Sequence, residues 1–123
     1  MLSSPKYRRL VDRAKDRGFE VRMIYVVLDS GDLQLRRIRN RVADGGHDVP
    51  ADKVASRRIR SFEQLAWFIN RVDECLIFDN STGQPALVAA LAPRGQMTVF
   101  EKLPPDLEHA LRADVPALFP DRQ

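Results

Sequence analysis

A nearly continuous apolar run at residues 20–28 constrains the fold of this chain more than any other segment. The run is rich in β-branched residues, which favour an extended strand. Its apolar residues follow one another almost without interruption, as in strands that lie in the middle of a parallel sheet. The run therefore predicts a strand that is covered on both faces.

The segments around this run predict helices packed on a sheet. Apolar side chains recur at helical spacing over residues 7–14, and Gly18 supplies a stop before the strand. A second helix is expected to open at residues 29–32, with Asp29 as its N-cap, and to end at the glycine pair 45–46. A helix, a glycine turn and a buried strand in this order favour an α/β layer arrangement.

Two helices are expected in the middle of the chain. Residues 50–58 predict a short helix that begins at a proline, and residues 61–64 form a capping box that opens a separate one. The second of these helices carries a regular apolar stripe, formed by Phe62, Leu65, Ile69 and Val72.

The last third of the chain predicts a strand, a hairpin and a helix. Residues 75–78 indicate a second buried strand, closed by a tight turn at 79–83. Residues 86–92 and 97–100 are candidate edge strands of a β-hairpin, and the terminal helix that follows is expected to break at Pro116.

Composition indicates one domain, residues 1–123, in a reducing compartment. With 44% hydrophobic and 30% charged residues, the chain can form one compact core. The single cysteine, Cys75, lies in an apolar run, which excludes a disulfide framework. The first residues contain no apolar signal core, and no apolar stretch approaches the roughly 18 residues of a membrane helix. We therefore expect a cytoplasmic protein without a membrane partner.

Charge is divided unevenly along the chain. Residues 1–60 contain 15 Lys and Arg against 8 Asp and Glu, a balance of +7, whereas residues 61–123 contain 5 against 9, a balance of −4. The asymmetry indicates an anionic ligand on the first half, either a nucleotide or a nucleic acid.

Arginines cluster around the motif Gly-Gly-His-Asp-Val-Pro at residues 45–50. A guanidinium group can contact two phosphate oxygens at once and stays protonated, so such a cluster suits a nucleotide lid. The predicted phosphate-binding residues are Arg41, Arg57 and Arg60. Those expected to form the lid or a turn are Gly45, Gly46, His47 and Asn80. The alternatives are that these arginines are solvated surface residues and that His47 and Asn80 only form hydrogen bonds within turns.

No metal-ligand spacing is present, since His47 and His109 are the only histidines.

These motifs resemble the C-terminal half of zeta-toxin-like P-loop kinases, which are also described as predicted ABC-type ATPases. The resemblance rests on residues 41–50, on Arg-Arg-Ile-Arg-Ser at 57–61 and on Phe-Asp-Asn-Ser at 78–81, and it runs from about residue 6 to residue 90. It implies a partial P-loop NTPase-like layer of parallel strands flanked by helices, followed by the C-terminal hairpin and helix. It also implies ATP and Mg²⁺ as cofactors, and transfer of phosphate to a small hydroxyl-bearing substrate.

The chain departs from that family in several respects, among them Gly31, which replaces a proline often found after the Asp-Ser pair. No Gly-Lys-Ser or Gly-Lys-Thr occurs, so the phosphate-binding loop with its lysine and its Mg²⁺-binding Ser/Thr cannot form from these residues. The resemblance places the catalytic base in the same missing front portion. Ser56 and Arg58 stand where relatives usually have an arginine and an aromatic residue. The catalytic residues are therefore unknown, and the chain alone is expected to have little or no kinase activity.

Two further functions fit the same residues. One is a non-catalytic module whose basic helices bind nucleic acid, although aromatic residues for base stacking are few. The other is a regulatory protein that depends on a partner. In that case a homo-oligomer or a partner chain would cover a hydrophobic strand edge left open by the missing half.

Overall fold

The computed structural model describes residues 5–43, 45, 50–91 and 97–119. Its strands are β1 (Arg22–Val27), β2 (Glu74–Asp79), β3 (Ala86–Leu91) and β4 (Met97–Val99). Its helices are α1 (Arg8–Asp16), α2 (Gly31–Ala43), α3 (Ala51–Ile69) and α4 (Pro105–Asp114), with 3₁₀ turns at Pro5–Tyr7 and Pro116–Leu118. The chain is a mixed α/β protein, as its sequence predicts.

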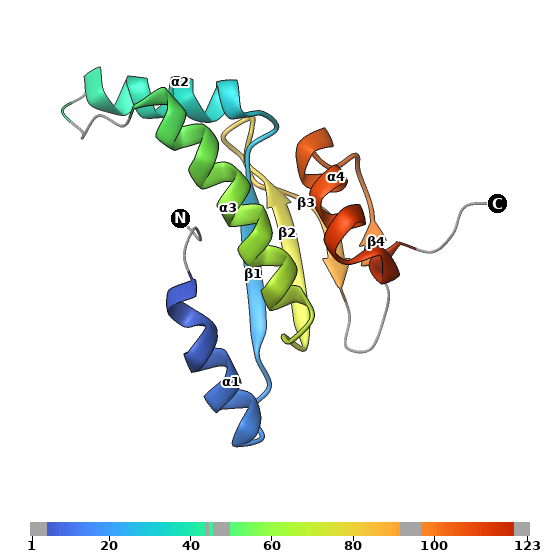
Figure 1. Ribbon diagram of the computed structural model, residues 1–123. Coiled ribbons are helices and arrows are strands. Elements are labelled where there is room, and N and C mark those ends of the chain that lie inside the picture. Colours follow the sequence, from blue (N-terminus) through green and yellow to red (C-terminus); the bar gives the residue numbers. More distant parts are fainter. Residues whose placement is uncertain (1–4, 44, 46–49, 92–96, 120–123) are drawn as a thin grey trace.

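The four strands form one sheet in the order β1, β2, β3, β4, with α3 and α4 on one face (Figure 1). β1 and β2 are parallel, with Arg22 opposite Glu74 and Val27 opposite Asp79. β2–β3 and β3–β4 are antiparallel, so the predicted hairpin is confirmed. β3 is nevertheless an inner strand rather than an edge, because it also pairs with β2.

The core lies between this sheet and the helices. The predicted apolar stripe is buried, both on α3 and at Val72, three residues beyond the end of that helix. The inward residues of β2 and of α4 are buried as well. These buried residues include Phe62, Leu65, Ile69, Val72, Cys75, Ile77, Leu107 and Leu111. Leu118 is also buried, beyond the break that the sequence predicts at Pro116. Within the described ranges, no helix is long and apolar enough to cross a membrane.

β1 departs from the prediction of a strand covered on both faces. Tyr25 and Val27 point into the core, but Ile24 and Val26 are 67% and 55% exposed. The helices cover only the other face of the sheet, and β1 is its outermost strand. The apolar, β-branched composition thus predicts the strand correctly, but the prediction of cover on the second face is wrong.

α3 is one continuous helix, so the predicted boundary near residues 58–61 is wrong. Val54, Arg58, Ser61 and Leu65 are all buried on one side of it, and this helical repeat runs through the expected boundary without a break. Ser61 does not act as a cap, because its hydroxyl forms a hydrogen bond with the hydroxyl of Tyr25 at 2.6 Å.

The N-cap of α2 is Ser30 rather than Asp29. The hydroxyl of Ser30 accepts a hydrogen bond from the backbone N–H of Leu33 at 3.1 Å, the bond expected of a capping side chain. Asp29 is exposed, and its backbone N–H donates to the hydroxyl of Ser81 instead. α2 ends at Ala43.

Asp73 connects α1 with the start of β1. Its carboxylate accepts hydrogen bonds from Nζ of Lys15 at 2.5 Å and from the backbone N–H of Val21 at 2.7 Å. Between these elements Gly18 has a φ of +80°, which side chains other than glycine rarely adopt, so the predicted stop at this residue is confirmed.

Candidate functional site

A cavity of about 480 Å³ lies where β1 ends, between β1, α2 and α3. β1 and β2 are parallel, so their carboxyl ends meet at this end of the sheet, which is where open α/β sheets commonly bind ligands. The described residues that line the cavity are Tyr25, Val26, Val27, Leu28, Gln34, Arg37, Ile38, Asn40, Arg41, Arg58, Ser61, Phe62 and Asn80.

Two arginines of α2 give one wall of the cavity a positive charge. Arg37 and Arg41 are four residues apart, so they lie on the same side of the helix. Arg37 donates through Nη2 to the carbonyl of Ser81 at 2.6 Å. Arg41 is exposed and forms no ion pair with any residue that the structure describes. Both guanidinium groups therefore keep donors for an anionic ligand.

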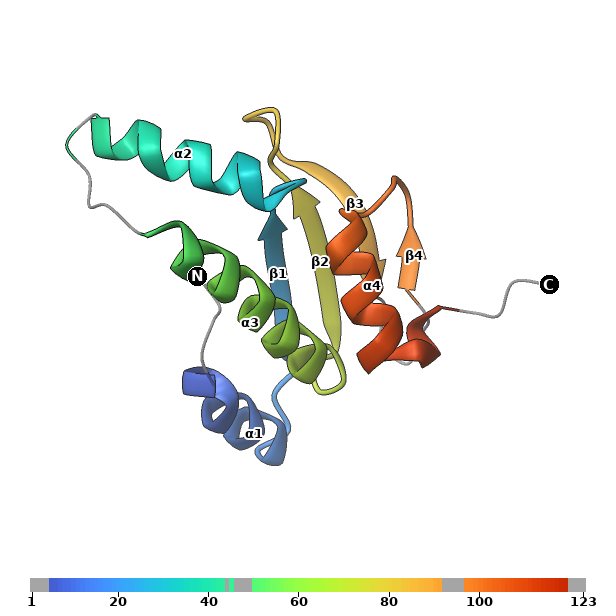
Figure 2. The same ribbon diagram turned by 45° about the horizontal axis from the view of Figure 1, so that its top comes forward.

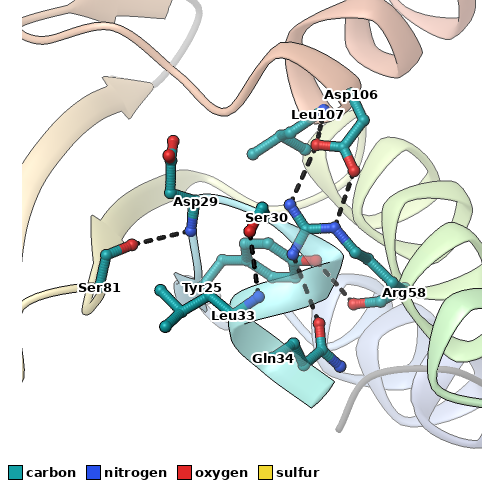
Figure 3. A network of polar contacts seen from close by, with 10 residues as sticks. Tyr25, Asp29, Ser30, Leu33, Gln34, Arg58, Ser81, Asp106 and Leu107 are labelled. Carbon is teal, nitrogen blue, oxygen red and sulfur yellow. Dashed lines mark hydrogen bonds and ion pairs between the residues drawn. The ribbon is translucent and has the colours of Figure 1, made fainter. Parts of the chain in front are cut away.

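Arg58 also lines the cavity, but its charge is neutralised within the protein (Figure 3). The side chain is only 5% exposed, and it donates to both carboxylate oxygens of Asp106, at 2.7 and 3.0 Å. Burial would raise the pKa of Asp106, but the hydrogen bonds and the charge of Arg58 outweigh burial and hold this pKa below its ordinary value. Arg58 also lies over the ring of Phe62 and donates to Oε1 of Gln34.

The inner wall of the cavity carries the hydroxyl pair of Tyr25 and Ser61. Burial raises the pKa of Tyr25 to about 12. The Tyr25 hydroxyl therefore stays protonated at physiological pH and offers a neutral hydrogen-bonding group to the cavity.

The turn after β2 closes the cavity on its other side. The backbone N–H and the hydroxyl of Ser81 both donate to Oδ1 of Asp79, and the Ser81 hydroxyl accepts from the backbone N–H of Asp29. These bonds hold the turn against the start of α2. Asn80 lines the cavity, and its Oδ1 is buried without a hydrogen-bond partner in the described part of the chain.

The structure brings two of the predicted site residues to this cavity. They are Arg41 and Asn80. Arg57 and Arg60 are exposed on α3 and are not among the described lining residues. Gly45 follows α2 with a φ of +99°, whereas Gly46 and His47 lie outside the described residues.

Arg37, Arg58 and Tyr25 line the cavity but are not among the site residues predicted from the sequence. The position of Arg37 could have indicated its role, because it shares a helix face with Arg41. The position of Arg58 could have done so too, since it falls within the inward-facing repeat of α3, where a charged side chain needs a partner. The partner, Asp106, lies 48 residues away in the sequence, and no local pattern indicates it.

Comparisons with known proteins found no match to this chain among protein-family models, curated proteins or solved structures. The resemblance to zeta-toxin-like kinases therefore stays a prediction.

The cavity residues fit phosphate better than they fit a metal ion. Arginine donors match phosphate oxygens, whereas Mg²⁺ prefers carboxylate, carbonyl and water oxygens. None of the described lining residues is an aspartate or glutamate. No group of three or more His, Cys, Asp or Glu residues in the described ranges could hold a metal ion. The described lining residues thus supply arginine donors but no carboxylate ligand for the Mg²⁺ that the resemblance implies.

Proposed function

We propose that this chain binds the phosphate groups of a nucleotide in the cavity between β1, α2 and α3. In this proposal it supplies the arginine-bearing part of an ATP-dependent phosphotransferase of the zeta-toxin-like kind. The observation that carries the proposal is the placement of Arg37 and Arg41 on one wall of the cavity. The volume of the cavity lies within the range of about 300–1,000 Å³ that small-molecule sites occupy.

The lining residues divide the cavity into a charged part and an apolar part. Arg37 and Arg41 would bind phosphate oxygens, while Ile38 and Phe62 offer apolar surface to the base or the sugar. Asn80 would add an amide from the turn after β2. The proposal assigns no role to Arg57 or Arg60.

The chain alone would bind the nucleotide without transferring phosphate. The Tyr25 hydroxyl is neutral, and the sequence contains no Gly-Lys-Ser or Gly-Lys-Thr loop. The lysine, the metal ligands and the catalytic base would come from a separate segment. In the complete enzyme the phosphate would pass to a small hydroxyl-bearing substrate, and we propose that the protein works in the cytoplasm.

Calorimetry of ATP binding, with and without Mg²⁺, tests this proposal. Arg37→Ala and Arg41→Ala should each weaken binding by about tenfold to a hundredfold, because a charge-assisted hydrogen bond contributes roughly 1.5–3 kcal/mol. Arg39→Ala is the matched control, since Arg39 is exposed on the same helix and is not among the described lining residues. No binding of ATP, or equal weakening by all three substitutions, would refute the proposal.

DNA and RNA should be titrated in the same series. The exposed arginines of α2 include Arg36 and Arg39, which lie outside the described cavity wall. Nucleic-acid binding that falls steeply with salt and depends on these two residues would favour the nucleic-acid alternative.

A further inference from the structure

The outer edge of β1 presents a row of backbone groups that pair with no strand in the described part of the chain. The carbonyls of Val21 and Val27 accept hydrogen bonds from Asp73 and Asn80, on the β2 side. Backbone groups of successive strand residues point to opposite sides, so the alternate residues of β1 point away from β2. The N–H and C=O groups of Arg22, Ile24 and Val26 therefore lie along an edge that has no neighbouring strand in the described sheet.

The two edges of the sheet differ in their protection. β4, at one edge, is only three residues long, and short edge strands resist pairing with other chains. β1, at the other edge, is six residues long and contains no proline or bulge, and its one charged residue, Arg22, lies at its first position. Its exposed Ile24 and Val26 are β-branched, the residue type that packs well beside another strand.

Two basic helices project on the open side of this edge. Both ribbon views show α1 and α2 on the side of β1 that faces away from β2 (Figures 1 and 2). α1 has four basic and two acidic residues, and α2 has four arginines and one aspartate. An added strand would therefore lie in a positively charged part of the molecule, with α1 before β1 and α2 after it.

A groove on α1 has the same chemistry. It is formed by Leu10, Arg13, Ala14, Arg17 and Phe19. Leu10 and Phe19 are more than half exposed, and Phe19 lies three residues before the start of β1. Apolar side chains flanked by arginines suit an apolar segment that carries acidic residues.

We propose that the free edge of β1 docks an extended segment of a partner protein. The segment would have β-branched residues at alternate positions and acidic residues at both ends. Backbone hydrogen bonds would add it to the sheet as a fifth strand, and its acidic ends would meet α1 and α2. This inference does not depend on the nucleotide proposal.

Charge favours such a partner over a second copy of this chain. Two-fold antiparallel pairing of two β1 edges would reverse one copy relative to the other. The helix before β1 in one copy would then lie near the helix after β1 in the other. Both helices are basic, so their repulsion opposes this dimer.

A display library of random nine-residue peptides, selected on the full chain, tests the inference. We expect enrichment of sequences with alternate β-branched residues and acidic ends. A synthetic peptide of the enriched sequence should bind about tenfold more weakly to Ile24→Pro, which removes an outward N–H without removing a bond to β2. The matched control Ile24→Thr keeps that N–H and a β-branched side chain, and it should bind as the wild type does. Circular dichroism checks that both variants fold.

N-methylation of the peptide gives a second test that needs no protein variant. Methyl groups on one alternate set of peptide amides should abolish binding, and methyl groups on the other set should not, because only one set faces β1. Four results would each overturn the inference: no enrichment, enrichment without acidic residues, equal effects of both methylated sets, or binding that Ile24→Pro leaves unchanged. If the wild-type protein in solution has a mass of twice 14.0 kDa and Ile24→Pro has half that mass, the β1 edge binds a second copy of this chain rather than a partner.

Discussion

Arg58 of α3 and Asp106 of α4 form an ion pair through two hydrogen bonds, Nε to Oδ2 at 2.7 Å and Nη2 to Oδ1 at 3.0 Å. The guanidinium is buried, whereas about half of the carboxylate surface is exposed. Two donors on two acceptors fix the orientation of both side chains. The pair therefore connects the C-terminal helix to the wall of the cavity.

Removing either partner of this pair should have unequal effects on stability. Asp106→Ala leaves a buried guanidinium without its countercharge and should lower the free energy of unfolding by about 3 kcal/mol. Arg58→Met fills the same space and leaves a carboxylate that water can reach, so it should cost about 1 kcal/mol. Urea unfolding followed by the fluorescence of Trp67 measures both, with Asp114→Ala, an exposed residue of α4, as the control. Equal losses for the two substitutions would contradict this account.

Stability should fall in acid because two aspartates have lowered pKa values in the folded protein. A hydrogen bond from Lys15, and then one from the backbone of Val21, lower the pKa of Asp73. Arg58 does the same for Asp106 against the effect of burial. Unfolded aspartate has a pKa of about 3.9, so both groups stabilise the fold above about pH 4 and lose this effect as the pH falls through their folded pKa values. Asp73→Asn should flatten this acid decline in urea unfolding measured from pH 6 to pH 2, and a decline as steep as that of the wild type would contradict the assignment.

Ser30 should stabilise α2 more than Asp29 does. Ser30→Ala removes the side chain that caps the helix and should cost about 1 kcal/mol. Asp29→Ala removes only a charge near the helix start and should cost a few tenths of a kcal/mol. Ser30→Asp keeps a capping oxygen and is expected to restore most of the loss in thermal unfolding. A larger loss for Asp29→Ala than for Ser30→Ala would show that Asp29 is the cap.

Cys75 should be chemically inert in the folded protein. The side chain is fully buried, and burial raises its pKa to about 12, so the reactive thiolate is scarce. A thiol reagent added at pH 8 should react only as fast as the chain unfolds, and immediately in concentrated urea. Immediate reaction without urea would show that β2 is accessible in the native state.

The sequence predicts most of the elements, because local patterns determine them. The stripe of α3, the turn at residues 79–83, the hairpin and the break at Pro116 all follow from spacing or from turn residues. The cover of β1 could not be predicted in this way. An apolar run favours a strand, but whether helices pack on both of its faces depends on segments distant in the sequence.

The site was harder to predict for a related reason. Arg37, Arg41 and Arg58 look alike in the sequence, but their surroundings differ. Arg37 is hydrogen-bonded to Ser81, Arg41 is exposed, and the charge of Arg58 is neutralised by Asp106. Tertiary contacts make these differences. Residue type and spacing can therefore indicate a basic cluster, but not which of its members are available to a ligand.

The parallel pairing of β1 with β2 also bears on how the chain folds. β2, β3, β4 and α4 are joined by short connections, whereas β1 reaches β2 only after residues 28–73, which contain two helices. Closing a long loop costs more entropy than closing a hairpin, and non-local pairing slows folding. We therefore expect β1 to join the sheet late in folding and to detach first under mild denaturation. Because β1 forms one side of the cavity, amide hydrogen exchange in this strand should reveal openings of the cavity that leave the rest of the protein folded.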